Sequence, residues 1–104
     1  MSDSLGELAK LVKAFADARN WEQYHTPKNL AMALAVEAAE IMEHFQWKTA
    51  EESQNLSEDQ HNEVAMELAD VFIYLMRLSQ SLDVDLIAAA NEKMAVNEQR
   101  FPVK

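Results

Sequence analysis

The chain has 104 residues, contains no cysteine, and carries a formal net charge of −9 at pH 7. This length predicts a single domain over residues 1–104, and the lack of cysteine excludes disulfides, thiolate metal sites and a cysteine nucleophile. So acidic a chain is also not expected to bind a nucleic acid polymer unaided, because it would repel the phosphates, and any phosphate ligand would need cations as mediators.

The composition favours helix along the whole chain. There are only one glycine and two prolines, and the abundant Ala, Leu, Glu and Met are good helix formers. We expect four helices, over about residues 4–19, 27–46, 57–82 and 85–98. Residues 48–56, KTAEESQNL, are polar and lack periodicity, so they predict a loop. Short connections favour antiparallel neighbours, so the predicted fold class is all-α, an antiparallel four-helix bundle-like fold.

Capping residues mark the predicted helix starts. Ser4 and Glu7 have the spacing of a capping box, as do Ser57 and Gln60 at the third helix. Before the second helix, Thr26 can cap and Pro27 suits the first helical position. The apolar stripe of the first helix consists of Leu8, Leu11, Val12 and Phe15.

Aromatic and polar residues lie around the ends of the second helix. Trp21 precedes it and Trp47 follows it, while His25 and Asn29 flank its start. Tryptophan at such positions usually covers a core, and His and Asn there usually act as caps. An aromatic plane beside polar groups can also stack on a nucleobase, so both interpretations stay open. His44 is expected on the surface.

Two carboxylates of the second helix fall where apolar side chains are expected. At about 100° per residue, Glu37 falls inside the apolar stripe and Glu40 about 60° to its side. In the third helix Glu67 and Asp70 share a strip with Tyr74, beside the apolar stripe. The apolar stripe of the second helix consists of Leu30, Leu34, Ile41 and Phe45. That of the third helix consists of Val64, Leu68, Val71, Leu75, Leu78 and Leu82.

Buried carboxylates must be neutralised or paired, which leaves two interpretations. Lys or Arg from another helix could form salt bridges with them. Alternatively, carboxylates from two facing helices form an all-oxygen site, which suits Mg²⁺ or Mn²⁺. A redox di-iron site is disfavoured, because it needs two Glu-x-x-His motifs. The one formal match, Glu58 to His61, lies in a helix first turn, where acids are favoured by the dipole and a solvated surface is expected.

Lys93, Asn97 and Arg100 lie on one stripe of the fourth helix. They either complement the helix dipole or form a phosphate clamp, and both interpretations stay open. The third helix also carries Met66, Phe72 and Ile73 outside its core stripe. Such a second apolar face predicts a homo-oligomer, a homodimer or a homotetramer. No apolar run is long enough for a membrane span and no secretory signal is present, so we expect a cytoplasmic protein with no membrane partner.

Several motifs in this chain together resemble one known family. The motif Glu37-x-x-Glu40 is followed by Glu67-x-x-Asp70, which resembles the metal motif of the MazG-like, all-α nucleoside triphosphate pyrophosphohydrolases. The stretches RNWEQYHTPKNL, HFQWKT, ELADVFIYLMRLS and KMAVNEQRFP resemble, in this order, stretches of the dCTP pyrophosphatase branch. Together they cover residues 19–102 with few gaps.

The resemblance implies a Mg²⁺-dependent enzyme that cleaves (deoxy)nucleoside triphosphates between the α and β phosphates, with dCTP or a modified relative as the expected substrate. It implies that subunits pair and that each site borrows residues from a neighbour. Some members have a base-contacting histidine where this chain has Val12. The implied metal ligands are Glu37, Glu40, Glu67 and Asp70. The implied nucleotide contacts are Trp21 to His25, Trp47 and Tyr74, with Lys93, Asn97 and Arg100 at the phosphate end.

Three points remain open from the sequence. Glu40 is our first candidate for the general base, although the sequence does not separate a base from a pure metal ligand. Asn29 is included among the candidate substrate contacts. A non-catalytic nucleotide sensor and a helical interaction module remain as alternative functions.

Overall fold

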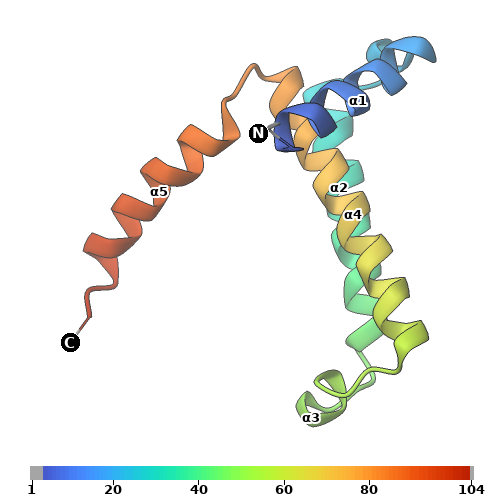
Figure 1. Cartoon of the computed structure of the whole chain (residues 1–104), viewed down its shortest axis with the longest axis vertical. Coiled ribbons are helices and arrows are strands. Elements are labelled where there is room, and N and C mark those ends of the chain that lie inside the picture. Colours follow the sequence, from blue (N-terminus) through green and yellow to red (C-terminus); the bar gives the residue numbers. More distant parts are fainter. Residues whose placement is uncertain (1–3, 104) are drawn as a thin grey trace.

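The computed structural model describes residues 4–103, which form helices joined by short connections (Figure 1). No strand occurs within this range, so the predicted all-α class is confirmed. The elements are α1 (Ser4–Ala18), the 3-10 turn η1 (Trp21–Gln23), α2 (Pro27–Phe45), α3 (Ala50–Ser53), α4 (Glu58–Ser81) and α5 (Leu86–Arg100).

Side-chain caps fix where three of the long helices begin. Thr26 accepts a hydrogen bond from the backbone N–H of Asn29 at 3.2 Å, and Pro27 begins α2 as predicted. Ser57 and Gln60 form the predicted capping box at the start of α4. Asp85 caps α5 through the N–H of Ala88. At α1, by contrast, Ser4 is already helical, and the residue before it lies outside the described range.

The loop predicted for residues 48–56 is wrong in its middle, where the short helix α3 occurs. Thr49 accepts from the N–H of Glu52 at 3.1 Å, and the Glu52 carboxylate accepts from the N–H of Thr49 at 2.9 Å. These hydrogen bonds stabilise the charged carboxylate and lower the pKa of Glu52. A four-residue helix is too short to show apolar periodicity, so the capping pair was its only signal in the sequence.

The core lies between α2 and α4, which run side by side, with α1 crossing one end of the pair (Figure 1). Leu30 of α2 is 1% exposed, and Val64 and Met76 of α4 are buried with it. Val12 and Ala16 bury one face of α1. The predicted stripes are therefore confirmed only in part, because Val12, Leu30 and Val64 are buried whereas Leu11, Phe15, Leu68 and Leu82 are exposed.

Helix α5 extends away from the other helices (Figure 1). None of its residues is fully buried, and Ile87, Met94 and Val96 are exposed. The link before it contains Asp83 in a left-handed conformation, with φ of 53°, which short polar residues tolerate. Helix α5, the fourth of the predicted helices, therefore buries none of its residues against the rest of the described chain. No described helix is both long and apolar enough to cross a membrane.

Candidate functional site

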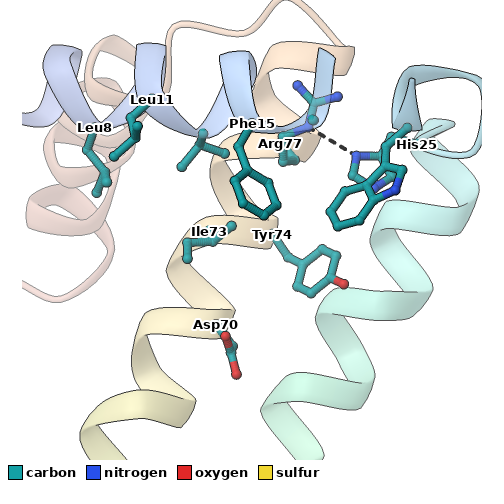
Figure 2. Close-up of a pocket in the computed structure, with 11 residues that line it drawn as sticks. Leu8, Leu11, Phe15, His25, Asp70, Ile73, Tyr74 and Arg77 are labelled. Carbon is teal, nitrogen blue, oxygen red and sulfur yellow. Dashed lines mark hydrogen bonds between the residues drawn. The ribbon is translucent and has the colours of Figure 1, made fainter. Parts of the chain in front are cut away.

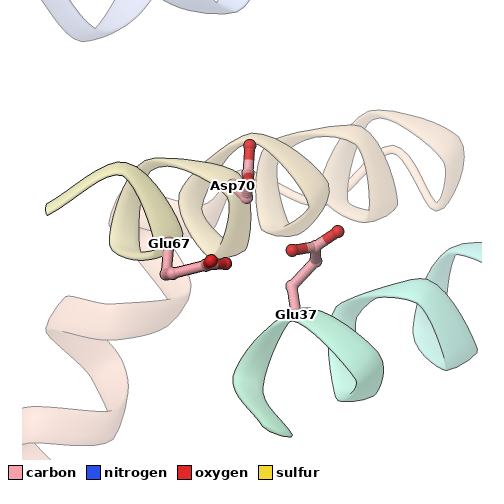
Figure 3. A group of neighbouring side chains, drawn as sticks. All are labelled: Glu37, Glu67 and Asp70. Atoms are coloured by element: carbon pink, nitrogen blue, oxygen red, sulfur yellow. The ribbon is translucent and has the colours of Figure 1, made fainter. Parts of the chain in front are cut away.

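Carboxylates from α2 and α4 meet in the middle of the helix pair. One oxygen each from Glu37, Glu67 and Asp70 lies within 4.8 Å of the others. Figure 3 shows the Glu37 carboxyl extending from α2 toward Glu67 and Asp70 on α4. The 3.6-residue helix period places Glu67 and Asp70 on neighbouring turns of one face, so both reach the same space.

Glu40 completes this acidic cluster of Glu37, Glu40, Glu67 and Asp70. Its carboxyl interacts with those of both Glu37 and Glu67. Burial raises the pKa of Glu37, and the neighbouring carboxyls of Glu40, Asp70 and Glu67 raise it further. A hydrogen bond with Glu40, followed by burial, raises the pKa of Glu67. The geometry thus brings three of the four predicted side chains together, Glu37, Glu67 and Asp70, with Glu40 interacting with the two glutamates among them.

The salt-bridge interpretation is not supported. Among residues 4–103, no Lys or Arg lies within ion-pairing distance of the cluster. Its one basic neighbour is His44, whose Nε2 lies 3.8 Å from Oε1 of Glu67. His44 is half-buried, so the expectation of a surface histidine is wrong. It occurs one helical turn after Glu40, a spacing that would have placed it beside the cluster.

Two buried oxygens of the cluster lack a partner. Oε2 of Glu37 and Oε2 of Glu67 are buried without a hydrogen bond. Buried polar atoms are normally satisfied, so two such atoms facing each other's helices indicate a missing positive group. An all-oxygen donor set matches the preference of Mg²⁺ and Mn²⁺. The residues present therefore fit a hard divalent cation.

A pocket of about 320 Å³ lies next to the cluster, between α1, η1 and α4 (Figure 2). Three predicted substrate contacts, Trp21, His25 and Tyr74, line it. The ring of Trp21 lies 5.5 Å from that of Phe15, edge to face, and 5.7 Å from that of His25. Further apolar lining comes from Leu8, Leu11, Val12, Ala16 and Ile73.

Asp70 belongs to both features, because it lines the pocket and supplies an oxygen to the cluster. Figure 2 shows Asp70 one turn below Tyr74 and Ile73 on α4. A ligand with an aromatic part in the pocket can therefore extend its polar part toward the carboxylates. This is the geometry expected for a flat base joined to a charged group.

Arg77 is a pocket residue that the sequence analysis did not identify. It is 6% exposed, and its Nε donates a hydrogen bond to Nδ1 of His25 at 3.1 Å. Burial, together with the positive charge of Arg77, lowers the pKa of His25. The available signal was an arginine inside the otherwise apolar run of residues 71–78.

The remaining predicted contacts do not join the pocket within one chain. Asn29 acts as a structural residue, since its Nδ2 donates to the carbonyl of Tyr24 at 3.0 Å. Trp47 is 88% exposed at the other end of α2, so it covers no core. Lys93, Asn97 and Arg100 lie on α5, away from the cluster (Figure 1).

Fold and site define an all-α protein with an acidic cluster suited to a hard cation and an adjoining aromatic pocket. The chain belongs to the MazG-like family, whose model matches residues 32–104. It is 38% identical to a pyrophosphatase from Archaeoglobus fulgidus DSM 4304 whose crystal structure is known. The likeness has a TM-score of 0.92 and covers 99% of this chain and 96% of that one.

Curated relatives are similar over nearly the whole of this chain. It is 42% identical over 101 residues to dCTP pyrophosphatase 1 of Homo sapiens, covering 95% of this chain and 59% of the relative. It is 41% identical over 102 residues to dCTP pyrophosphatase 1 of Rattus norvegicus, covering 96% and 60%. The chain thus spans about 60% of the length of these relatives.

Proposed function

We propose that this chain hydrolyses a nucleoside triphosphate between its α and β phosphates and releases the monophosphate and pyrophosphate. The substrate is dCTP or a related or modified deoxynucleotide, in keeping with the names of the curated relatives. The observation that carries the proposal is the position of Asp70, shared by the acidic cluster and the aromatic pocket. It supports a ligand with a base at one end and a cation-bridged phosphate chain at the other.

Glu37, Glu40, Glu67 and Asp70 would hold the metal, Mg²⁺ or the similar Mn²⁺. When bound, such an ion neutralises phosphate charge and lowers the pKa of water. This accounts for how so acidic a chain accepts a phosphate ligand at all.

The chain's own residues divide the remaining tasks. Glu40 interacts with both Glu37 and Glu67 and is our candidate for the base that takes a proton from the attacking water. Trp21 and Tyr74 supply aromatic surface for the base of the nucleotide. No serine, cysteine or histidine nucleophile is required, because water attacks the phosphate directly.

A second copy of the chain would complete the phosphate end of the site. Lys93 and Arg100 are exposed on α5 and lie away from the cluster of their own chain. In a homodimer or homotetramer, α5 of one copy can pack on another and bring these cations and Asn97 to the triphosphate. Trp47 is equally free to contact a neighbouring site. The protein would then act as a cytoplasmic housekeeping enzyme of the nucleotide pool.

A pyrophosphate-release screen with Mg²⁺ across the eight common ribo- and deoxynucleoside triphosphates tests the proposal. We expect release to be fastest with dCTP. Comparable turnover of all eight would contradict the base preference. A nucleotide sensor would bind without releasing pyrophosphate, and an interaction module would neither bind nor release it.

A further inference from the structure

Arg77 is the one charged residue within 4–103 that is fully buried. None of the described carboxylates lies within ion-pairing distance of it. Its hydrogen bonds go instead to two neutral groups, Nδ1 of His25 at 3.1 Å and Oε1 of Gln80 at 2.8 Å. A buried charged side chain is normally paired with an opposite charge. Because Arg77 hydrogen-bonds only to neutral groups, ion pairing does not explain its position.

The Gln80 amide fixes the direction of this network. Its Nε2 donates to the backbone carbonyl of Ala9 in α1 at 3.0 Å, so its oxygen is left to accept from Arg77. The network therefore runs from α1 through α4 to the connection before α2. The hydroxyl of Ser81 further ties the backbone carbonyl of His25 to α4 at 3.5 Å. These contacts hold the His25 ring against that of Trp21, and both residues line the pocket. Figure 2 shows the hydrogen bond between His25 and Arg77 there.

The chemistry of Arg77 then determines the state of His25. A guanidinium nitrogen is always a donor and does not lose its proton in proteins. Nδ1 of His25 must therefore offer its lone pair, and a neutral imidazole in this position carries its hydrogen on Nε2. Burial and the nearby positive charge also lower the pKa of His25, which favours the neutral ring.

We infer that Arg77 is a positioning residue that holds His25 as the neutral tautomer with its hydrogen on Nε2, so that the pocket wall offers a nucleoside a neutral hydrogen-bond donor. The inference rests on the proposed function for its ligand. The matching ligand group is a neutral acceptor, such as a base carbonyl oxygen or an unprotonated ring nitrogen. Cytosine carries both kinds of acceptor.

Long-range ¹H–¹⁵N spectra of the ¹⁵N-labelled protein report the tautomer directly. The His25→Phe variant assigns the ring signals of His25 among the three histidines. We expect the hydrogen on Nε2 in wild type and in Arg77→Lys, which keeps a permanent donor, and a mixture of tautomers in Arg77→Met. Hydrogen on Nδ1 or a cationic ring in wild type would overturn the inference, as would an unchanged tautomer in Arg77→Met.

Kinetics test whether Arg77 acts through His25. Arg77→Met should raise KM for the preferred triphosphate roughly three- to tenfold with kcat unchanged, which is the loss expected for one neutral hydrogen bond. In the His25→Phe background the same substitution should add nothing further. Lys10→Met, which removes an exposed cation of α1, is the matched control. An independent, additive effect of Arg77→Met would mean that it acts on the fold instead.

The two experiments separate this inference from the function it rests on. Urea unfolding shows whether each variant folds. If Arg77→Met does not fold, the tautomer measured in wild type can still refute the inference. The spectra need no turnover. Absence of pyrophosphate release from wild type would reject the proposed function. The tautomer of His25 would still be tested independently by the spectra.

Discussion

Glu37 shows how one residue can be unfavourable for the fold and useful for a site. Its pKa is raised by burial and by three neighbouring carboxyls, so without a cation the folded chain holds a proton there more tightly than the unfolded chain does. Such a group contributes stability that is fully present below its ordinary pKa of 4.5 and is lost as the pH rises through the raised value. Charge on Glu37 therefore opposes folding at neutral pH.

We predict that in chelator the Glu37→Gln variant gains stability relative to wild type as the pH rises above 4.5. Glutamine cannot ionise, so it escapes the cost that wild type meets. Urea unfolding at a series of pH values measures the difference. Glu43→Gln, on the exposed side of the same helix, is the control, and a difference for Glu37→Gln that stays constant with pH would contradict the prediction.

The acidic cluster could be predicted from the sequence because residue spacing determines the side of a helix from which each side chain projects. Glu37 falls on the apolar side of α2, and Glu67 and Asp70 border the apolar side of α4, so their meeting could be predicted. Arg77 could not be predicted in the same way. Its role depends on contacts with Gln80 and with His25 more than fifty residues away, and such pairing depends on how the helices pack.

At the scale of elements, short side-chain caps determine where helices begin. Ser57 and Gln60 satisfy each other's backbone N–H groups at 3.2 Å and 3.0 Å. This pair starts α4, the helix that carries Glu67, Asp70, Tyr74 and Arg77. The capping box was predictable because it is local, whereas the direction of α5 was not, because that helix has no local packing partner.

We predict that Ser57→Ala lowers the free energy of unfolding by about 1 kcal/mol, the usual cost of losing an N-cap. Urea unfolding followed by circular dichroism measures it. Ser57→Asp keeps a capping oxygen and should retain most of the stability. An equal loss in both variants would mean that the serine acts in some way other than capping.

At the scale of the whole molecule, the chain is too open for a compact monomer. It exposes 8367 Å², whereas a compact monomer of 11.8 kDa exposes about 5,900 Å². Its radius of gyration is 16.7 Å, against about 13 Å for a compact chain of this length. The excess surface is about three times the ~800 Å² that one partner buries in a standard interface. Much of it is apolar, as in Met66, Met94 and Phe72.

We predict that the protein is a homodimer or homotetramer in solution, because exposed apolar surface of this extent is normally covered. Light scattering should give a mass of at least twice the 11.8 kDa of the chain. Met66→Lys places a charge on a residue that is 70% exposed in the single chain and should lower that mass. Gln54→Lys, on an exposed polar position, should leave it unchanged. An active monomer at assay concentration would refute the prediction.

Binding of a divalent cation is the role proposed for Glu37 and its neighbours. Unfolding of wild type and of Glu37→Gln, first in chelator and then in excess Mg²⁺, tests it most directly. Wild type should gain about 2.7 kcal/mol at one hundred times the dissociation constant. The variant should gain much less, should show no turnover, and should be no less stable than wild type in chelator. A strongly destabilised variant in chelator, with no effect of Mg²⁺ on wild type, would mean that these carboxylates hold the fold together instead.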